Sequence, residues 1–186
     1  GDFAPIERNG WTSGTDWFKS KGLPGQVLTE LNAEGVSGKF NPDGVFQGLW
    51  EFDYLEIEKA TVGLQSPNSA LQQPIKKAPK PWYAAFLPSR FYPKVIRAKE
   101  VTVEWEFRNE SASIQPMELE VVPVGKDWNC GGHGGYLHIS LTPAMAVDKL
   151  EILLSRDWFT IEKLVLVGPI GETTENAAAS DAKTKT

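Results

Sequence analysis

Three side chains that could bind a metal or attack a substrate lie within the segment 125–141, GKDWNCGGHGGYLHISL. They are Cys130, His133 and His138, the only cysteine and the only two histidines of the chain. Zinc could take all three as ligands, but the spacing C-x2-H-x4-H matches no closed structural zinc site and lacks a fourth ligand. A Cys–His nucleophile pair would need a third residue to orient the histidine, and none stands at a recognisable spacing. A metal or nucleophile site is therefore the less favoured interpretation of this segment.

The glycines of the same segment give the favoured interpretation. The run GGHGG permits sharp backbone turns and the close approach of a ligand. We predict a glycine-rich, hairpin-like loop that carries Trp128 and Tyr136 at its two shoulders. If 136–141 is a strand, His138 shares a face with Tyr136 on the surface of the sheet.

Paired carboxylates are the second set of residues that could do chemistry. Glu104 and Glu106 lie on the outward face of one predicted strand, and Glu118 and Glu120 lie on that of the next. A pair ~5–9 Å apart, as glycoside hydrolysis requires, is thus available. Alternating glutamates are also the common pattern of a solvated sheet face, and no apolar pocket isolates one of them to raise its pKa. An enzyme remains an alternative, and a solvated face is favoured.

Period-two alternation predicts the strands that would position these groups. Between 101 and 108 the odd positions are apolar and the even positions polar, which assigns Trp105 to the core. Other strands are predicted over 26–31, 36–40, 49–64, 117–124, 136–141, 149–154 and 157–167. In the strand from Leu49, the apolar residues change parity near Tyr54–Leu55, which predicts a bulge or twist there.

The composition favours an all-β fold. The 186 residues include seven Trp, four Tyr, nine Phe, thirteen Pro and seventeen Gly, and no period-3.6 stripe is sustained. We predict a single domain over 1–170. Six prolines between 65 and 93 predict a long connection without a central strand or a long helix. The small polar residues of 171–186 predict a disordered tail or a linker to another module.

Charge and hydropathy exclude two classes of partner. The net charge is −5, the isoelectric point is about 5.2, and the sequence has no basic block beyond the short cluster of Lys76, Lys77 and Lys80. A nucleic-acid binder needs a basic face, so we expect no nucleic-acid partner. No apolar run approaches the ~20 residues that cross a bilayer, so we expect no membrane partner. The first residues do not form a signal peptide. Because the chain begins with Gly1 rather than Met, a processed or excised piece is an open interpretation, and a signal that had been removed would not be visible.

Both ends of the chain resemble a known family. The opening GDFAPIERNGW (1–11) resembles the "GDFE…GW" start of carbohydrate-binding modules with a galactose-binding-like jelly roll. The stretch 137–168, LHISLTPAMAVDKLEILLSRDWFTIEKLVLVG, resembles their last three strands, and the predicted middle strands fit the same order. The chain departs from the family pattern at Glu162, where an Asp is usual, and in the segment 65–93, which has no counterpart.

The resemblance implies an antiparallel jelly-roll β-sandwich of roughly eight strands that binds a polysaccharide and does no chemistry. It further implies a secreted location beside other modules of a glycoside hydrolase or related multi-domain protein. Such modules often hold a structural calcium between the start of the chain and the last strand, where Asp2 and Glu162 stand here. Oxygen ligands suit calcium, although two surface carboxylates are the plainer interpretation.

Sugar rings have an apolar face, so exposed aromatic rings flanked by polar groups are the expected binding surface. The candidates in turn-rich stretches are Trp11, Trp17, Trp82, Tyr83, Trp128 and Tyr136. About half of them are expected only to pack at the rim of the sandwich. Trp50, Phe52 and Tyr54 share one parity and could form a platform on a strand, although a core role is favoured.

Two other functions remain open on the sequence alone. A viral or phage structural jelly-roll protein would explain the long proline-rich segment and the absence of chemistry. A polysaccharide-degrading enzyme domain would use the paired glutamates.

Overall fold

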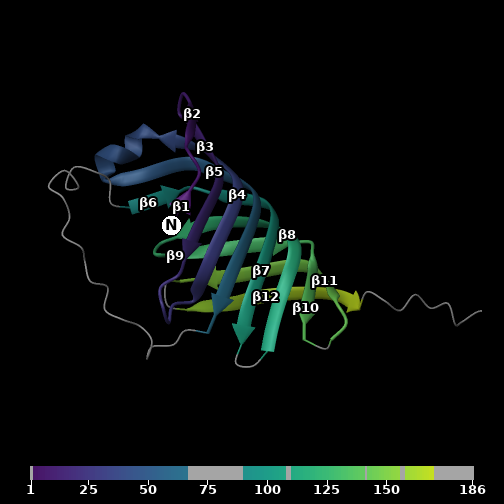
Figure 1. The fold of residues 1–186 in the computed structure, drawn as a ribbon. Coiled ribbons are helices and arrows are strands. Elements are labelled where there is room, and N and C mark those ends of the chain that lie inside the picture. Colours follow the sequence, from purple (N-terminus) through teal and green to yellow (C-terminus); the bar gives the residue numbers. More distant parts are fainter. Residues whose placement is uncertain (1, 67–89, 108–109, 141, 156–157, 170–186) are drawn as a thin grey trace, which may run out of the picture.

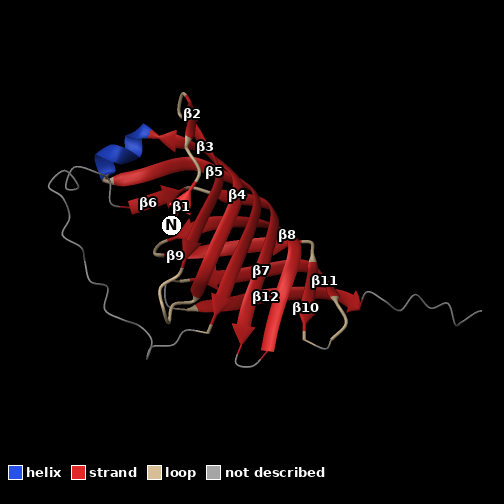
Figure 2. Ribbon diagram, viewed as in Figure 1, coloured by secondary structure: helices blue, strands red, loops and turns tan. Residues whose placement is uncertain are grey.

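The structure is a computed structural model, and it describes residues 2–66, 90–107, 110–140, 142–155 and 158–169. This part of the chain forms strands and one short 3-10 helix (Figure 2). In chain order the elements are β1 (Asp2–Phe3), β2 (Glu7–Asn9), β3 (Thr12–Lys21), β4 (Leu28–Asn41), η1 (Pro42–Gln47), β5 (Leu49–Gln65), β6 (Arg90–Pro93), β7 (Ile96–Phe107), β8 (Glu110–Val124), β9 (Asp127–His133), β10 (Tyr136–Ile139), β11 (Met145–Leu154) and β12 (Phe159–Pro169). The predicted all-β fold is confirmed. Within the described residues, no helix is long and apolar enough to cross a membrane.

All the strands belong to one hydrogen-bonded sheet. Its order is β1-β3-β4-β5-β7-β8-β10-β11-β12, with β2 paired to β3, β6 to β5, and β9 to both β8 and β11. Most pairs are antiparallel, but β5 runs parallel to both β6 and β7. The expectation of a purely antiparallel arrangement is therefore wrong at the centre of the sheet. Parallel neighbours need a crossover of a dozen or more residues, and the long segment after β5 supplies it.

The sheet curls around one hydrophobic core. Figure 1 shows β11 and β12 crossing behind the strands from β3 to β8. One cluster of buried apolar residues joins both parts: Val27, Ala60, Leu64, Ala98, Val101, Val103, Ile114, Met117, Cys130, Leu137, Val147, Leu150 and Ile152. Trp105 packs against this cluster, as its alternation predicts.

The curl coincides with a break in alternation at one level of the sheet. Glu58 and Lys59 of β5 are both exposed, and so are Lys99 and Glu100 of β7. Lys59 and Glu100 are paired across the two strands, and the β7–β8 register shifts between Ala98 and Val101, across Lys99 and Glu100. Extra residues of this kind bend a strand and increase its twist, so the same apolar face can close over the core on both sides of the bend.

The glycine-rich segment is only in part the predicted hairpin-like loop, because Gly131 and Gly132 lie within β9 while Gly134 and Gly135 form a bend between β9 and β10. The hairpin turn lies earlier, at 125–126, and β9 and β10 pair with β8 in one continuous register on either side of Gly134 and Gly135. Glycine is needed here for close packing: a Cβ on Gly132 would lie 2.1 Å from Cε of Met117. Gly132 therefore marks tight contact inside the sheet, whereas Gly134 and Gly135 connect two strands that share β8 as their partner.

Candidate functional site

Five aromatic rings form a continuous row at the end of the sheet where β4 and β5 run past β7. The row, called here the aromatic row, consists of Trp11, Phe40, Trp50, Phe52 and Phe91. Phe40 contacts Trp11, Trp50 and Phe52, and Phe52 contacts Phe91. The centroids of the contacting rings are 5.5 to 6.1 Å apart, and the rings are tilted against one another by 41 to 64°. Such tilted and edge-on contacts are favoured aromatic geometries.

Strand register brings these rings together from four places in the sequence. Phe40 of β4 is the cross-strand partner of Phe52 of β5, and Trp50 is the parallel partner of Phe91 of β6. Trp11, in the turn before β3, accepts a hydrogen bond at its carbonyl oxygen from the backbone N–H of Phe40 at 2.8 Å. Paired side chains stand on the same face of a sheet, so one face carries the whole row.

This face is the continuation of the core face. The register of β4 and β5 shifts between Lys39 and Phe40, so that Asp53 is the extra residue. The bulge predicted near Tyr54–Leu55 is thus present, one residue earlier. A Cβ built on Gly38 would meet both Leu55 and Phe52, which shows that these two side chains share a face despite their opposite parity.

The outer rings of the row are open to solvent. Trp11 is 52% exposed, Trp50 is 40% exposed and Phe91 is 54% exposed, whereas Phe40 and Phe52 are half-buried between them. The platform alternative for Trp50 and Phe52 therefore agrees with the structure better than the favoured core assignment. Three exposed rings on a two-ring base form an apolar surface that can receive the flat side of a ligand.

A polar network supports the row from the opposite face of the sheet. Glu51 is 9% exposed and accepts a hydrogen bond from Nδ2 of Asn41 at 2.8 Å. Nζ of Lys94 lies 3.0 Å from Glu51 Oε1 and 2.9 Å from Asp53 Oδ1. The hydrogen bond from Lys94 lowers the pKa of Asp53, and the hydrogen bond to Asp53 raises the pKa of Lys94. Because Lys94 directly follows β6, this network fastens the strand that carries Phe91.

Two exposed indoles each lie beneath a cation. The guanidinium of Arg8 is 5.6 Å from the centroid of the Trp11 ring, and Nζ of Lys19 is 5.8 Å from the centroid of the Trp17 ring. Both distances are within the range of a cation–π contact. Arg8 therefore places a positive charge at the end of the aromatic row that Trp11 forms.

The structure separates the aromatic residues that the sequence proposed as one surface. Trp17 is 38% exposed on β3. It follows Trp11 by six residues, which places it roughly 20 Å from Trp11 along the strand. Tyr136 is 43% exposed on β10, which lies beyond β7 and β8 in the sheet. Trp128 is half-buried and packs against the core. Trp82 and Tyr83 lie outside the described residues, so Trp11 alone of the six is placed in the row.

Sequence patterns did not identify Phe40, Phe91 or Arg8. Phe40 was assigned only to a short strand, and Phe91 belonged to the proline-rich segment, whose last residues form β6. The usable signal was the density of aromatic residues on both sides of the NPDG turn (41–44). Their pairing depended on register, which no local pattern contains.

The residues proposed for metal or nucleophile chemistry point to different sides of the sheet. Cys130 is 7% exposed and faces the core, whereas His133 and His138 are exposed. Burial raises the pKa of the Cys130 thiol from 9.0 to about 11, which keeps it protonated and unreactive at neutral pH. Among the residues that the structure describes, no group of three or more His, Cys, Asp or Glu side chains could hold a metal ion.

The strand order does not place the two predicted calcium ligands, Asp2 and Glu162, on neighbouring strands. Asp2 is in β1 and Glu162 is in β12, the two ends of the sheet order. Asp2 pairs with Lys19, and Glu162 is the extra residue of a bulge opposite Glu151 and Ile152. A structural calcium bound by these residues stays a prediction.

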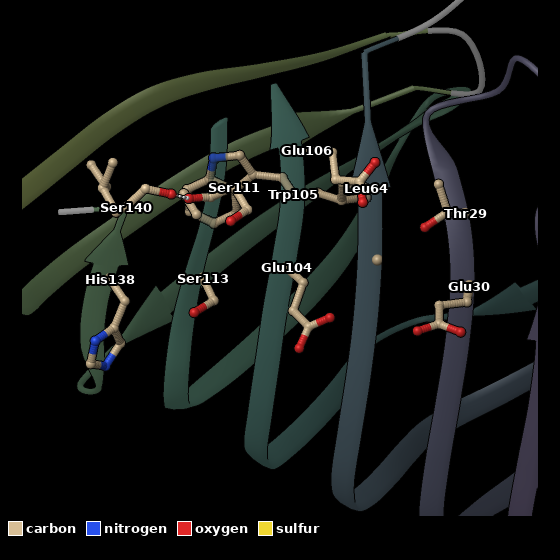
Figure 3. Close-up of a pocket in the computed structure, with 13 residues that line it drawn as sticks. Thr29, Glu30, Leu64, Glu104, Trp105, Glu106, Ser111, Ser113, His138 and Ser140 are labelled. Carbon is tan, nitrogen blue, oxygen red and sulfur yellow. Dashed lines mark hydrogen bonds between the residues drawn. The ribbon is translucent and has the colours of Figure 1, made fainter. Parts of the chain in front are cut away.

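A polar hollow of about 500 Å³ lies on the outer face of the sheet (Figure 3). His138, Ser113 and Glu104 are successive cross-strand partners, and Gly63 continues the line to Glu30. Figure 3 shows these side chains standing in a row across neighbouring strands. Glu104 and His138 are exposed to solvent. Trp105, Leu64 and Ile139 also line the hollow, but they are buried or half-buried. The hollow therefore offers hydrogen-bonding groups without an exposed ring surface, and the aromatic row is the stronger candidate site.

The glutamates proposed as a catalytic pair are not opposite each other. Glu104 is the partner of Ser113, and Glu120 is the partner of Arg97, with which it forms an ion pair of 3.0 Å. Glu118 lies five residues from Ser113 along β8, roughly 17 Å away. The cross-strand spacing that glycoside hydrolysis requires is therefore absent between these two glutamate pairs.

Comparisons with known proteins give no family for the chain. No protein-family model matches it, and comparisons with curated proteins and with solved structures found no match. The resemblance to carbohydrate-binding modules therefore remains a prediction.

Proposed function

We propose that this chain is a non-catalytic module that binds a polysaccharide along the aromatic row. The observation that supports this most is that the face of β4 and β5 that lines the core continues beyond the core. There it ends in Trp11, Trp50 and Phe91, each at least 40% exposed. Large apolar rings left in water favour a ligand that removes them from it. A saccharide has the required chemistry, because its C–H faces stack on rings while its hydroxyl groups stay hydrated.

The shape of the surface favours an extended ligand. The row crosses from the β2–β3 turn over β4 and β5 to β6, so its exposed rings come from neighbouring segments across the sheet. A small ligand would contact one of these rings, whereas a chain can contact several of them. Affinity would be modest, because few ring contacts remain after the ordering costs of binding.

The jelly-roll class and a secreted location are part of this proposal. They rest on the resemblance of the segments 1–11 and 137–168 to galactose-binding-like modules. The two parallel pairings of β5 are a difference from that class. Structural calcium and attachment to other modules of a carbohydrate-active protein belong to the same proposal.

The test is affinity electrophoresis of the chain through native gels that contain plant, algal or microbial polysaccharides. Trp11→Ala, Trp50→Ala and Phe91→Ala are each expected to weaken the retardation about tenfold in apparent affinity, as for the central residues of an interface. Trp158→Ala is the matched control, because Trp158 is 41% exposed and lies outside the row. Circular dichroism and urea unfolding separate lost binding from lost folding. Unchanged mobility of the wild-type chain on every glycan would remove the proposal.

A structural protein that assembles with other chains is the second candidate. The edge strand β12 exposes Ile161 (41%), Leu164 (36%) and Val167 (59%), and exposed apolar edges are typical of assembling strands. The bulge at Glu162 weakens this candidate, because a charged bulge is a common protection of an edge. Light scattering on the purified chain decides: a stable oligomer of the wild type that Leu164→Lys dissociates would favour assembly.

A further inference from the structure

We infer that the polysaccharide bound by the aromatic row is acidic, and that Arg8 selects it by binding a carboxylate or sulfate group on a sugar. This inference rests on the proposed function, and it names the class of glycan and the residue that reads its charge. It begins from one cation whose position is fixed and whose hydrogen-bonding capacity is largely unused.

One side of the Arg8 guanidinium is held in place by the protein. Nε donates a hydrogen bond of 2.8 Å to the carbonyl oxygen of Gly10. The guanidinium carbon lies 5.6 Å from the centroid of the Trp11 ring. Gly10 adopts a φ of +64° in the β2–β3 turn, so the turn presents its carbonyl oxygen to the arginine that precedes it. The orientation of the guanidinium is therefore set before a ligand arrives.

The other side of the guanidinium is available. Within the described residues Arg8 forms no salt bridge, whereas Arg97 is paired with Glu120 and Lys94 with Glu51. The two terminal nitrogens of Arg8 can donate to both oxygens of one planar acid group, which is the geometry in which arginine binds carboxylates and related anions. Because Arg8 lies over one face of the Trp11 ring, a sugar would contact the rest of this exposed ring and the row beyond it, with an acid substituent beside these nitrogens.

The negative charge around Arg8 means that an acidic glycan would be recognised by direct contact with the guanidinium and not by long-range attraction. Three carboxylates, Glu7, Asp16 and Glu58, line the same hollow as Arg8, and the chain carries a net charge of −5. A polyanion is thus not drawn to the protein as a whole, and its acid groups gain only where they meet the guanidinium. Screening by salt should weaken the contact only moderately, because it acts at short range.

The experiment compares glycans that share a backbone and differ in charge. Binding is measured by affinity electrophoresis and by isothermal titration calorimetry for polygalacturonate and its fully methyl-esterified form, and for dextran sulfate and dextran. The first pair tests a carboxylate and the second a sulfate ester. The wild type is expected to bind the charged member of at least one pair about tenfold more tightly than the uncharged member.

Three variants assign the preference to Arg8. Arg8→Gln is expected to lose the preference while binding of the uncharged member persists, and Arg8→Lys to retain only part of it because lysine lacks the fork of donors. Arg90→Gln is the control, since Arg90 is exposed and pairs with Leu49, on the face opposite to Phe91. Unfolding in urea checks that each variant is folded.

The outcomes separate this inference from the proposed function. Equal binding of charged and uncharged glycans, or an equal effect of Arg8→Gln and Arg90→Gln, overturns the role of Arg8 and leaves a glycan-binding row in place. Absence of binding to these four glycans and to every plant, algal and microbial polysaccharide of the affinity-electrophoresis test overturns both.

Discussion

The ammonium group of Lys94 lies 3.0 Å from the carboxylate of Glu51, whose side chain is almost entirely buried. Lys94 also reaches Asp53, the extra residue of the β5 bulge. One lysine after β6 thus neutralises two acids of β5 on the face opposite to the aromatic row. The position of Phe91 depends on this contact, because β6 is joined to the sheet only through β5 among the described strands.

Replacing this lysine should loosen the end of the sheet that carries the row. In Lys94→Met the buried carboxylate of Glu51 loses its cation, so the urea midpoint of unfolding should fall clearly below that of the wild type. Lys59→Met is the control, because its 3.5 Å pair with Glu100 is exposed on both sides and should contribute almost nothing. Equal midpoints for the two variants would contradict the role given to Lys94.

The same contact predicts an acid dependence with a definite sign. The Lys94 hydrogen bond lowers the pKa of Asp53 below its ordinary 3.8, so the folded state favours the ionised carboxylate. The resulting stabilisation is present above about pH 3.8 and is lost as the pH falls through the lowered pKa. The difference in stability between the wild type and Lys94→Met should therefore shrink below that pH, which urea unfolding at a series of pH values measures.

The two glycines between β9 and β10 should differ in their tolerance of a side chain. Both have positive φ, +75° for Gly134 and +79° for Gly135, but only Gly135 lacks space: its Cβ would lie 2.3 Å from the carbonyl oxygen of Pro116. Gly134→Ala should cost about 1 kcal/mol of unfolding free energy for the strained backbone. Gly135→Ala should cost roughly 1–3 kcal/mol more, because backbone must move. Equal losses of unfolding free energy for the two variants would contradict the close approach of Gly135 to Pro116.

The Cys130 thiol predicts a loss of stability in alkali. Its pKa is raised from 9.0 to about 11 by burial, so the folded state keeps its proton while the unfolded chain ionises. The stabilisation is complete below pH 9 and should decline by about 2–3 kcal/mol as the pH rises to 11. Unfolding free energies of the wild type and Cys130→Ala, measured over this range, isolate the thiol from other groups that titrate there. Parallel curves for the two proteins would disprove the assignment.

Two tryptophans proposed as binding residues should respond differently to removal. Trp128 packs against the core, so Trp128→Ala should lower the unfolding free energy by about 2–4 kcal/mol. Trp17 lies on the surface under Lys19, and Trp17→Ala should cost less than about 1 kcal/mol. Urea unfolding followed by circular dichroism measures both. A small loss of unfolding free energy for Trp128→Ala would contradict core packing and favour a binding role for Trp128.

Local patterns were sufficient for the class of fold. The alternation between 101 and 108 predicted a strand and a core position for Trp105, and both are found in β7. The parity change near Tyr54 predicted a bulge that lies at Asp53. These features depend on the two-residue period of a strand and on side-chain polarity, and both can be determined from consecutive residues of the sequence.

Local patterns failed where glycine and proline serve long-range contacts. The glycines near His133 were interpreted as a loop because the run GGHGG permits sharp backbone turns, but Gly132 lies in β9 and leaves room for Met117 of another strand. The proline-rich segment was interpreted as a connection throughout, yet its last residues form β6 on the edge of β5. The partner that makes each residue suitable is remote in sequence.

The sequence by itself determined an all-β protein with more aromatic rings than one core requires, since composition and alternation are properties of the chain alone. Only the tertiary structure decided which rings share a surface. Trp11, Phe40, Trp50 and Phe91 meet because of strand register and one parallel pairing. Register places side chains from distant segments on one face, and a shift by a single residue would have sent them to the other.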